Sequence, residues 1–291
     1  MTLPKVLLSV LESSLGQVVE AMPVGGGDIS HAARVRLAHG SQALIKWRSN
    51  SLPGLFTAER RGLELLRSAG VLRVPEVLAQ SEATADCPGF IAMEWLNPGS
   101  KSTHSAEALG VGLAALHRVT VASFGLGNDN FIGANPQPNR PNDDWVAFFR
   151  EQRLRFQMEL ARRNGLLPAQ RARRLELLLD RLDNWLPAHP PASLLHGDLW
   201  GGNWLTTASG EPALIDPAVY YGHREADLAF TELFGGFPAA FYAAYRTSGP
   251  LDNGYEERKD LYNLYHLLNH LNLFGEGYGG SVDSILQRYV S

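Results

Sequence analysis

Hydrophobic positions in the first third of the chain change from one period to another. Residues 4–16 have apolar side chains at helical spacing and end on Gly16, which predicts a short helix. Residues 17–47 contain three strand-like runs separated by glycine-containing breaks, which predicts three antiparallel strands. An amphipathic helix is predicted for residues 56–70, and two further strands for the runs VPEVLAQSE and GFIAMEWL. The pattern therefore predicts a sheet of about five strands with one helix inserted.

The rest of the chain has mostly helical patterns. Only the short apolar runs around the sequence HGDLWGGNW interrupt them, and the segment NPGS at residues 97–100 separates this part from the strands. We therefore expect an α+β chain in two lobes. The N-terminal lobe, residues 1–97, would contain the antiparallel sheet, and the C-terminal lobe, residues 98–291, would be mostly helical, with a hinge near residues 94–98.

Composition adds little to this picture but excludes several classes of function. The 291 residues are 45% hydrophobic and 19% charged, and the net charge of -4 with dispersed basic residues makes nucleic acid an unexpected partner. The one dense basic run, residues 162–174, is expected to be a solvated helix face. A single cysteine, Cys87, excludes an internal disulfide framework. The apolar run near the N-terminus is too short to span a bilayer, so we expect a cytoplasmic protein with no membrane partner.

One motif in the second lobe has the residue types that phosphoryl transfer needs. The sequence HGDLWGGNW places His196 two positions before Asp198 and Asn203 five positions after it, and LIDPA brings Asp216 after a short apolar run. Phosphoryl transfer requires a carboxylate near the attacking hydroxyl and oxygen ligands for Mg²⁺ beside it. Asp198 is the candidate for the first role, and Asn203 and Asp216 are the candidates for the second.

The first lobe contains a candidate nucleotide site. Gly25, Gly26 and Gly27 lie between two predicted strands, where bare backbone can approach phosphates, although a plain hairpin turn explains them equally well. Lys46 lies on the third predicted strand and Glu59 in the helix that follows. In a kinase lobe such a lysine contacts the phosphates and is held by the glutamate. The order of these features, followed by the motif of the second lobe, favours a nucleotide-dependent phosphotransferase.

Longer blocks of the sequence resemble one known family. The segments HGDLWGGNW, LIDPAVYYGHREADLAF and LYHLLNHLNLFGEGYG are similar to the fructosamine kinases, also called ketosamine-3-kinases, and so is the Asn- and Pro-rich insertion at residues 128–154. The resemblance covers nearly the whole chain. It implies the aminoglycoside-phosphotransferase-like variant of the protein-kinase fold, with ATP as phosphoryl donor and Mg²⁺ as its metal.

The resemblance also implies roles for individual residues. Asp198 would accept the proton of a sugar hydroxyl, and His196 would support the loop rather than react. Asn203 and Asp216 would hold Mg²⁺, while Pro217, where a protein kinase has Phe, stiffens the turn and argues against a mobile activation segment. The backbone of the linker would bind the adenine edge through Met93, Glu94, Trp95 and Leu96.

By the same resemblance, the acceptor is the 3-hydroxyl of a ketosamine, the adduct of a sugar on an amine, in deglycation repair. The amine belongs either to a small molecule or to a glycated protein lysine, and a ribulosamine is expected to react better than a fructosamine. Trp200 and His270 are expected to contact this substrate. Some relatives form a redox-sensitive disulfide through a cysteine in the glycine loop, but Asp28 stands at that place here, so we expect no such switch and favour a monomer.

Two other functions stay open at this point. A kinase for aminoglycosides, choline or homoserine would use the same catalytic residues, and the pocket of such an enzyme could use the late acids Asp252, Glu256, Glu257 and Asp260. A non-catalytic scaffold with a kinase fold is the second alternative, although this chain keeps the lysine, base and metal positions. A hydrolase has no support, because no serine lies in a nucleophile-elbow context.

Two pairs of polar residues have a structural and a functional interpretation. His266 and His270 have the spacing of a helical zinc pair but lack the glutamate of H-E-x-x-H, so zinc is not expected. They could instead border the sugar pocket or pack in the helix. Glu225 and Asp227 begin a predicted helix, where they either brace the catalytic loop, through Arg224 or through backbone amides, or bind substrate.

Overall fold

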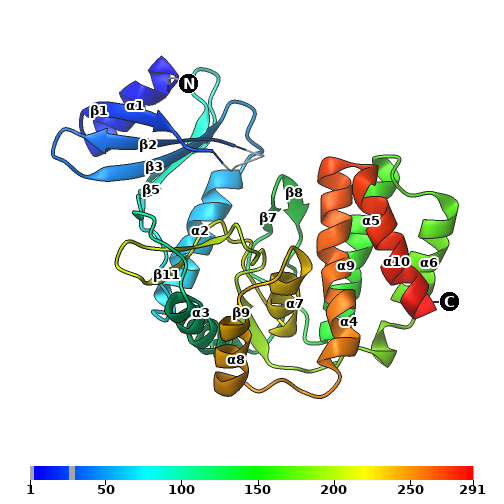
Figure 1. Cartoon of the computed structure of the whole chain (residues 1–291). Helices are drawn as coiled ribbons and strands as arrows, with labels where there is room; N and C mark the ends of the chain where they lie inside the picture. The colour runs from blue at the N-terminus through cyan, green and yellow to red at the C-terminus, as the bar shows by residue number, and fades with distance from the viewer. Residues whose placement is uncertain (1–2, 26–29, 291) are drawn as a thin grey trace.

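The computed structural model describes residues 3–25 and 30–290, and it divides into a sheet-containing part and a helical part (Figure 1). The sheet has five antiparallel strands, as the sequence predicts, and their order is β1-β2-β3-β5-β4. Their bounds are β1 Val18–Pro23, β2 His31–Leu37, β3 Gln42–Arg48, β4 Val77–Ser81 and β5 Gly89–Glu94. Two helices belong to this part, α1 Lys5–Leu15 and α2 Leu55–Ser68.

Alternation of buried and exposed side chains places the sheet between these two helices. One face of β2 and β3 is apolar and packs in the same cluster as Leu7 and Leu11 of α1. On the other face, Phe56 and Leu63 of α2 share a cluster with Ile91 of β5. Residues 89–93 are therefore buried on both faces, which is the physical reason that β5 is a continuous apolar run. The edge strand β1 is largely exposed.

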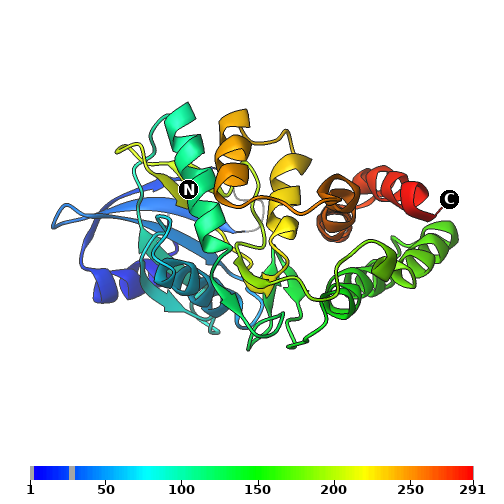
Figure 2. The same cartoon turned by 90° about the horizontal axis from the view of Figure 1, so that it is seen from below.

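The second part of the chain is mostly helical, as expected. Its α-helices are α3 Thr103–Leu116, α4 Trp145–Phe149, α5 Phe156–Arg163, α6 Ala169–Leu179, α7 Glu225–Leu233, α8 Ala239–Ser248, α9 Tyr255–Phe274 and α10 Gly279–Val290. A π-helical turn, Arg150–Arg155, joins α4 to α5. In both views the helices α5, α6, α9 and α10 lie together at the end of the molecule opposite the sheet (Figures 1 and 2).

Short strands carry the loops between these helices. A three-stranded sheet combines β12 Tyr220–Gly222, β9 Ala192–Leu195 and β6 Thr120–Val121, and two hairpins combine β10 Trp204–Thr206 with β11 Pro212–Leu214 and β7 Asn130–Ile132 with β8 Asn135–Gln137. The last hairpin lies in the Asn- and Pro-rich insertion. The insertion is therefore an ordered structural element.

The connection between the two parts is anchored to the second. After β5 ends, the Gly99 N–H donates to Thr206 O at 2.7 Å, and a Cβ on Gly99 would lie 2.3 Å from Thr207 O. Only glycine allows the backbone to approach β10 this closely. The lobe bounds of 1–97 and 98–291 and the hinge near 94–98 stay a prediction.

The basic run at residues 162–174 is not one solvated helix face, contrary to expectation. It spans the end of α5, a turn and the start of α6, and the guanidinium of Arg171 is buried. Arg171 donates to Glu276 at 2.7 Å and to Asp283 at 2.9 Å. The charge therefore ties α6 to the C-terminal helices, because a buried guanidinium needs carboxylate partners.

No helix within residues 3–25 and 30–290 combines the length and apolar character needed to cross a membrane.

Candidate active site

A strand and a sharp turn position the candidate base. Strand β9 leads directly into His196, Gly197 and Asp198. Gly197 has a φ of 81°, and a Cβ there would lie 2.0 Å from Ala218 O. Both the left-handed backbone and the close approach require glycine, which explains the middle residue of HGD.

Asp227 binds the backbone of this turn. Its carboxylate lies in the first turn of α7 and accepts the N–H groups of His196 at 2.7 Å and Gly197 at 2.8 Å. His117 Nε2 lies 3.2 Å from the same carboxylate. Asp227 thus braces the catalytic loop through backbone amides, which is one of the two roles expected for it. Glu225 does not take part, since it forms two 2.7 Å bonds with Arg258 instead.

The histidine of the motif supports the loop. His196 is fully buried, and its Nε2 lies 2.9 Å from Ile215 O. Burial lowers the pKa of His196, although the charge of Asp227 opposes this effect. A neutral, buried imidazole that bonds to backbone fits the expected supporting role.

Asn203 connects the candidate base to the candidate metal segment. Its Nδ2 donates to Asp198 Oδ2 at 2.9 Å and to the Asp198 carbonyl at 2.8 Å, and it lies 3.4 Å from Asp216 O. The five-residue spacing works because the chain turns between them: the Asn203 N–H donates to Trp200 O at 3.0 Å. Burial, with Asp216 as a further cause, raises the pKa of Asp198 to about 7.

Asp216 stands at the end of the β10–β11 hairpin in an unusual backbone conformation. Its φ of 56° is the only positive value at a non-glycine position among the described residues. The neighbouring Ile215 N–H donates to Asn203 O at 3.1 Å. The Asp216 side chain is 41% exposed and therefore accessible to a ligand.

Lys46 is the residue that joins the two parts of the chain at this site. Its Nζ donates to Glu59 Oε1 of α2 at 2.8 Å and also forms an ion pair with Asp216. Burial opposes the charge of Lys46, but Asp216 and Glu59 outweigh that effect and raise its pKa above the ordinary value. The ammonium therefore keeps its charge near neutral pH, which suits it to bind phosphate.

Glu82 fixes the helix that carries Glu59. Its carboxylate accepts the N–H groups of Gly54 at 3.0 Å and Thr57 at 3.1 Å, at the N-terminus of α2. A carboxylate at this end satisfies free amides and complements the helix dipole. Sequence patterns did not indicate Glu82, because it lies 25 residues beyond Thr57 and reaches the helix only through the fold.

The predicted adenine-binding linker follows β5. Glu94 forms an ion pair with Arg73, and Trp95 Nε1 donates to Asn97 Oδ1 at 3.0 Å, so both side chains have local partners. The Leu96 N–H donates to no described residue. Within residues 93–96 this amide is the donor left for a ligand, whereas the Met93 side chain is buried in the core.

The donor set near Asp198 fits Mg²⁺. Asp216 offers a carboxylate, and the amide of Asn203 directs its NH₂ group to Asp198, so that its Oδ1 has no hydrogen-bond donor among the described residues. Hard oxygen ligands of this type suit Mg²⁺. Of the predicted glycines, Gly25 is exposed after β1, while Gly26 and Gly27, like Asp28, lie outside the described residues.

The two predicted substrate residues lie on separate elements. Trp200 is 39% exposed in the turn after Asp198. His270 lies on α9, where its Nδ1 is 2.7 Å from His266 O and its ring contacts Phe234 and Tyr278. No hydrogen bond or ring contact within the described part of the chain joins Trp200 to His270.

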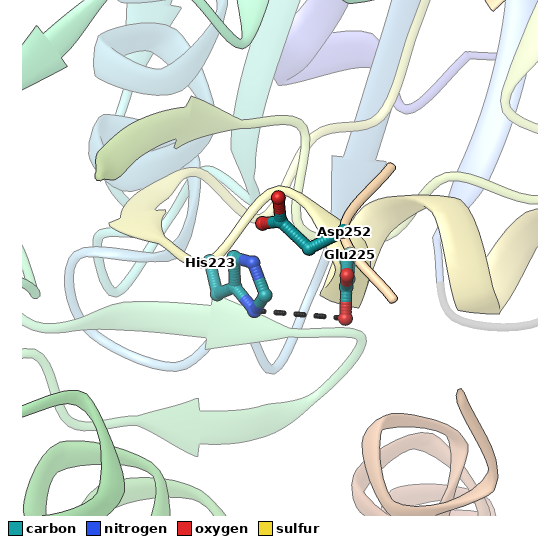
Figure 3. Close-up of side chains that lie close together, drawn as sticks. All are labelled: His223, Glu225 and Asp252. Atoms are coloured by element: carbon teal, nitrogen blue, oxygen red, sulfur yellow. Dashed lines mark ion pairs between the residues drawn. The ribbon is translucent and has the colours of Figure 1, made fainter. Parts of the chain in front are cut away.

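Within residues 3–25 and 30–290, one group has ligand atoms close enough for a different metal, namely His223, Glu225 and Asp252 (Figure 3). Arg258 already forms two bonds with Glu225, and His223 Nδ1 lies 2.7 Å from Tyr262 Oη. Burial, reinforced by the charge of Arg258, lowers the pKa of His223 to about 3. The positive charge of Arg258 therefore already neutralises Glu225, and this ion pair braces α7 against α9.

Comparison with known proteins agrees with this geometry. The family described as fructosamine kinase matches residues 4–291. A Synechocystis protein named as a probable ketoamine kinase is 42% identical, covering 94% of this chain and 90% of its own length. The Arabidopsis thaliana protein named protein-ribulosamine 3-kinase, chloroplastic, is 37% identical over 96% of this chain and 85% of its own.

Solved structures extend the comparison to the fold. A crystal structure from Thermobifida fusca, named for fructosamine-3-kinase, has a TM-score of 0.86 at 34% identity and covers 97% of each chain. An aminoglycoside phosphotransferase in complex with AMP-PNP and hygromycin B has a TM-score of 0.68 at 16% identity, covers 97% of this chain and 98% of its own, and shows the shared kinase-like fold alone. The chain belongs to the fructosamine kinase family, and its reaction class is that of the ketosamine-3-kinases, phosphoryl transfer to an alcohol group.

Proposed function

We propose that this chain transfers the γ-phosphoryl group of Mg²⁺-ATP to the 3-hydroxyl of a ribulosamine or fructosamine, with Asp198 as the proton acceptor. The observation that carries the proposal is the convergence of Lys46, Asp216, Asn203 and Asp198, which come from both parts of the chain and are linked by direct contacts. Such a set supplies the positioning and charge stabilisation on which phosphoryl transfer depends.

Each residue of the set has a separate task. Lys46, held by Glu59, orients the phosphates of the nucleotide, and the Leu96 amide is available to the adenine edge. Asp216 and the Oδ1 of Asn203 hold Mg²⁺, which neutralises charge on the phosphates when it is bound. Asp198 orients the attacking hydroxyl and accepts its proton. Phosphate at carbon 3 is a better leaving group than hydroxide, so the adduct then decomposes and frees the amine.

The alternatives fit the structure less well. Asp260 forms an ion pair with Arg288, and Glu256 forms one with Lys259, so two of the four late acids do not present free charge to a cationic antibiotic. A non-catalytic scaffold has no need of a lysine paired with both Glu59 and Asp216 beside Asp198. Within this proposal, a monomeric state and a cytoplasmic location stay predictions.

The reaction itself provides the first test. Ribulosylated and fructosylated peptides, incubated with the protein and Mg²⁺-ATP, should gain one phosphate and then return to the mass of the unmodified peptide, with the ribulosylated peptide reacting faster. Mass spectrometry follows both steps. If neither peptide gains phosphate while kanamycin or choline does, the ketosamine assignment is wrong and the phosphotransferase assignment stands.

Two glycines follow Trp200 in the turn after Asp198, and one of them leaves room for its ring. Gly201 and Gly202 both lack a positive φ, so the backbone does not require glycine at either position. A Cβ on Gly202, however, would lie 2.4 Å from the Trp200 ring, while a Cβ on Gly201 would have no atom within 4 Å. Gly202 thus leaves room for the indole, and Gly201 offers a matched control for a substitution.

We expect Gly202→Ala to raise the KM for the ketosamine about three- to tenfold, the equivalent of one aromatic contact, because the added methyl displaces the Trp200 ring. Gly201→Ala should leave this KM and the KM for ATP unchanged. In a Trp200→Ala background, Gly202→Ala should have little further effect, since both changes remove the same contact. Additive losses in the double variant would contradict a role through Trp200. Steady-state kinetics with both substrates provide the measurement.

A further inference from the structure

The insertion between residues 128 and 154 contains several buried amide side chains. Asn130, Gln137 and Asn139 are all buried at the β7–β8 hairpin. Burial of an amide is unfavourable unless its donors and acceptors find partners. The partners of these side chains therefore indicate what the hairpin is built to hold.

Gln137 bonds at both ends of its amide. Its Nε2 donates to Ala218 O at 3.0 Å and to Asn130 Oδ1 at 2.8 Å, and its Oε1 accepts the hydroxyl of Tyr265 at 2.6 Å. Tyr265 is a buried residue of α9. Gln137 thus links α9 to the backbone two residues after Asp216.

The neighbouring amides extend this network. Asn130 Nδ2 donates to Val219 O at 2.8 Å, and its Oδ1 also accepts Asn139 Nδ2 at 2.7 Å. The Oδ1 of Asn139 in turn accepts the guanidinium of Arg153 at 2.7 Å. Arg153 is fully buried, forms no ion pair with a described carboxylate, and stacks on Tyr220 with 4.0 Å between its Cζ and the ring centroid. The hairpin therefore binds two consecutive carbonyls, those of Ala218 and Val219, and Arg153 of the π-helical turn supports it through Asn139.

These carbonyls belong to a segment that is strained where it meets the metal site. Asp216 has a φ of 56°, a conformation that a non-glycine residue keeps only when its surroundings impose it. Pro217 has no N–H to offer a neighbour. The Ala218 N–H bonds to His196 O at 2.9 Å, and the hairpin amides hold the two carbonyls that follow.

We propose that Gln137 is a positioning residue for Asp216: through Ala218 it keeps the Asp216 carboxylate in the conformation that binds Mg²⁺ with the nucleotide. The inference rests on the proposed function, in which Asp216 is a metal ligand. Groups that orient a metal ligand without touching the metal typically contribute 10- to 100-fold to metal affinity. In a protein kinase a mobile segment follows the metal-binding aspartate, whereas here a buried amide network holds that segment.

The test is a calorimetric titration of ADP at increasing Mg²⁺ concentration. Gln137→Leu removes all three hydrogen bonds while keeping a similar volume, and it should raise the Mg²⁺ concentration needed for tight ADP binding by about tenfold. Binding of ADP without Mg²⁺ should not change, because Lys46 and the linker stay intact. Excess Mg²⁺ should restore most of the kcat. An unchanged Mg²⁺ requirement in a folded Gln137→Leu protein would overturn the proposal.

Two further variants keep the result interpretable. Asn135→Ala removes a buried amide of the same hairpin that bonds to Asn269 at 2.9 Å instead, so it should lower stability without changing the Mg²⁺ requirement. Tyr265→Phe removes only the hydroxyl that holds Gln137, and it should shift the requirement in the same direction by a smaller factor. If Gln137→Leu does not fold, Tyr265→Phe decides: an unchanged Mg²⁺ requirement in that variant would overturn the proposal.

Asp216→Asn separates this inference from the proposed function. It should abolish most of the Mg²⁺ dependence of ADP binding in any background. If Asp216→Asn keeps normal Mg²⁺ dependence, the metal assignment of Asp216 is wrong, whatever Gln137 does. If Asp216→Asn loses the dependence and Gln137→Leu does not, the positioning role of Gln137 alone is wrong.

Discussion

Replacing Asp198 with asparagine should reduce kcat by about 10²- to 10⁴-fold, the range expected for loss of a general base. The substitution keeps the shape of the side chain, and the new amide oxygen can still accept Asn203 Nδ2, which now donates to Asp198 Oδ2 at 2.9 Å. The loop should therefore keep its fold. What disappears is the carboxylate that orients the attacking hydroxyl and takes its proton.

Binding distinguishes this loss from general damage to the site. Calorimetry should show that Asp198→Asn binds Mg²⁺-ATP nearly as tightly as the wild type, because neither Lys46 nor Asp216 changes. Single-turnover assays with a ribulosylated peptide should then show binding without transfer. A kcat within about tenfold of wild type would exclude Asp198 as the base, since that is less than the lower limit for this role.

Removing the amino group of Lys46 should have the second-largest effect. We expect Lys46→Ala to lower kcat/KM by about 10²- to 10³-fold, as found when one preorganised charge-stabilising donor is removed from an active site. The same change leaves the largely buried carboxylate of Glu59 without its 2.8 Å partner, which should also lower stability. Activity and stability must therefore be measured on the same samples.

A paired variant separates these two effects. In Lys46→Ala/Glu59→Gln the uncompensated charge is gone, so the thermal midpoint should recover while activity stays low. Glu59→Gln alone should be milder than Lys46→Ala, because Lys46 keeps its amino group and its ion pair with Asp216. If Lys46→Ala retains activity within about threefold of wild type, a difference well below the expected range, Lys46 has no role at the nucleotide.

Short-range patterns in the sequence predicted most of the fold. The helix at the N-terminus, the antiparallel strands and the helix with Glu59 all appear where period and glycine breaks placed them. This succeeded because the alternation of apolar residues records which face of each element is buried. It failed for the run at residues 162–174, since periodicity alone could not show that Arg171 finds carboxylates more than 100 residues away.

The candidate site likewise has some features that the sequence predicts and others that only the fold creates. By itself the sequence determined the spacing that lets Asn203 reach Asp198, because a single turn after a strand brings them together. Only the tertiary structure decided that Lys46 meets Asp216 across 170 positions and that Gln137 reaches Ala218 across 81. Contacts of that kind depend on how the sheet and helices pack, and no local pattern of side chains encodes them. The hairpin that holds the Asp216 segment was therefore visible in the sequence as an insertion, while its partners were not.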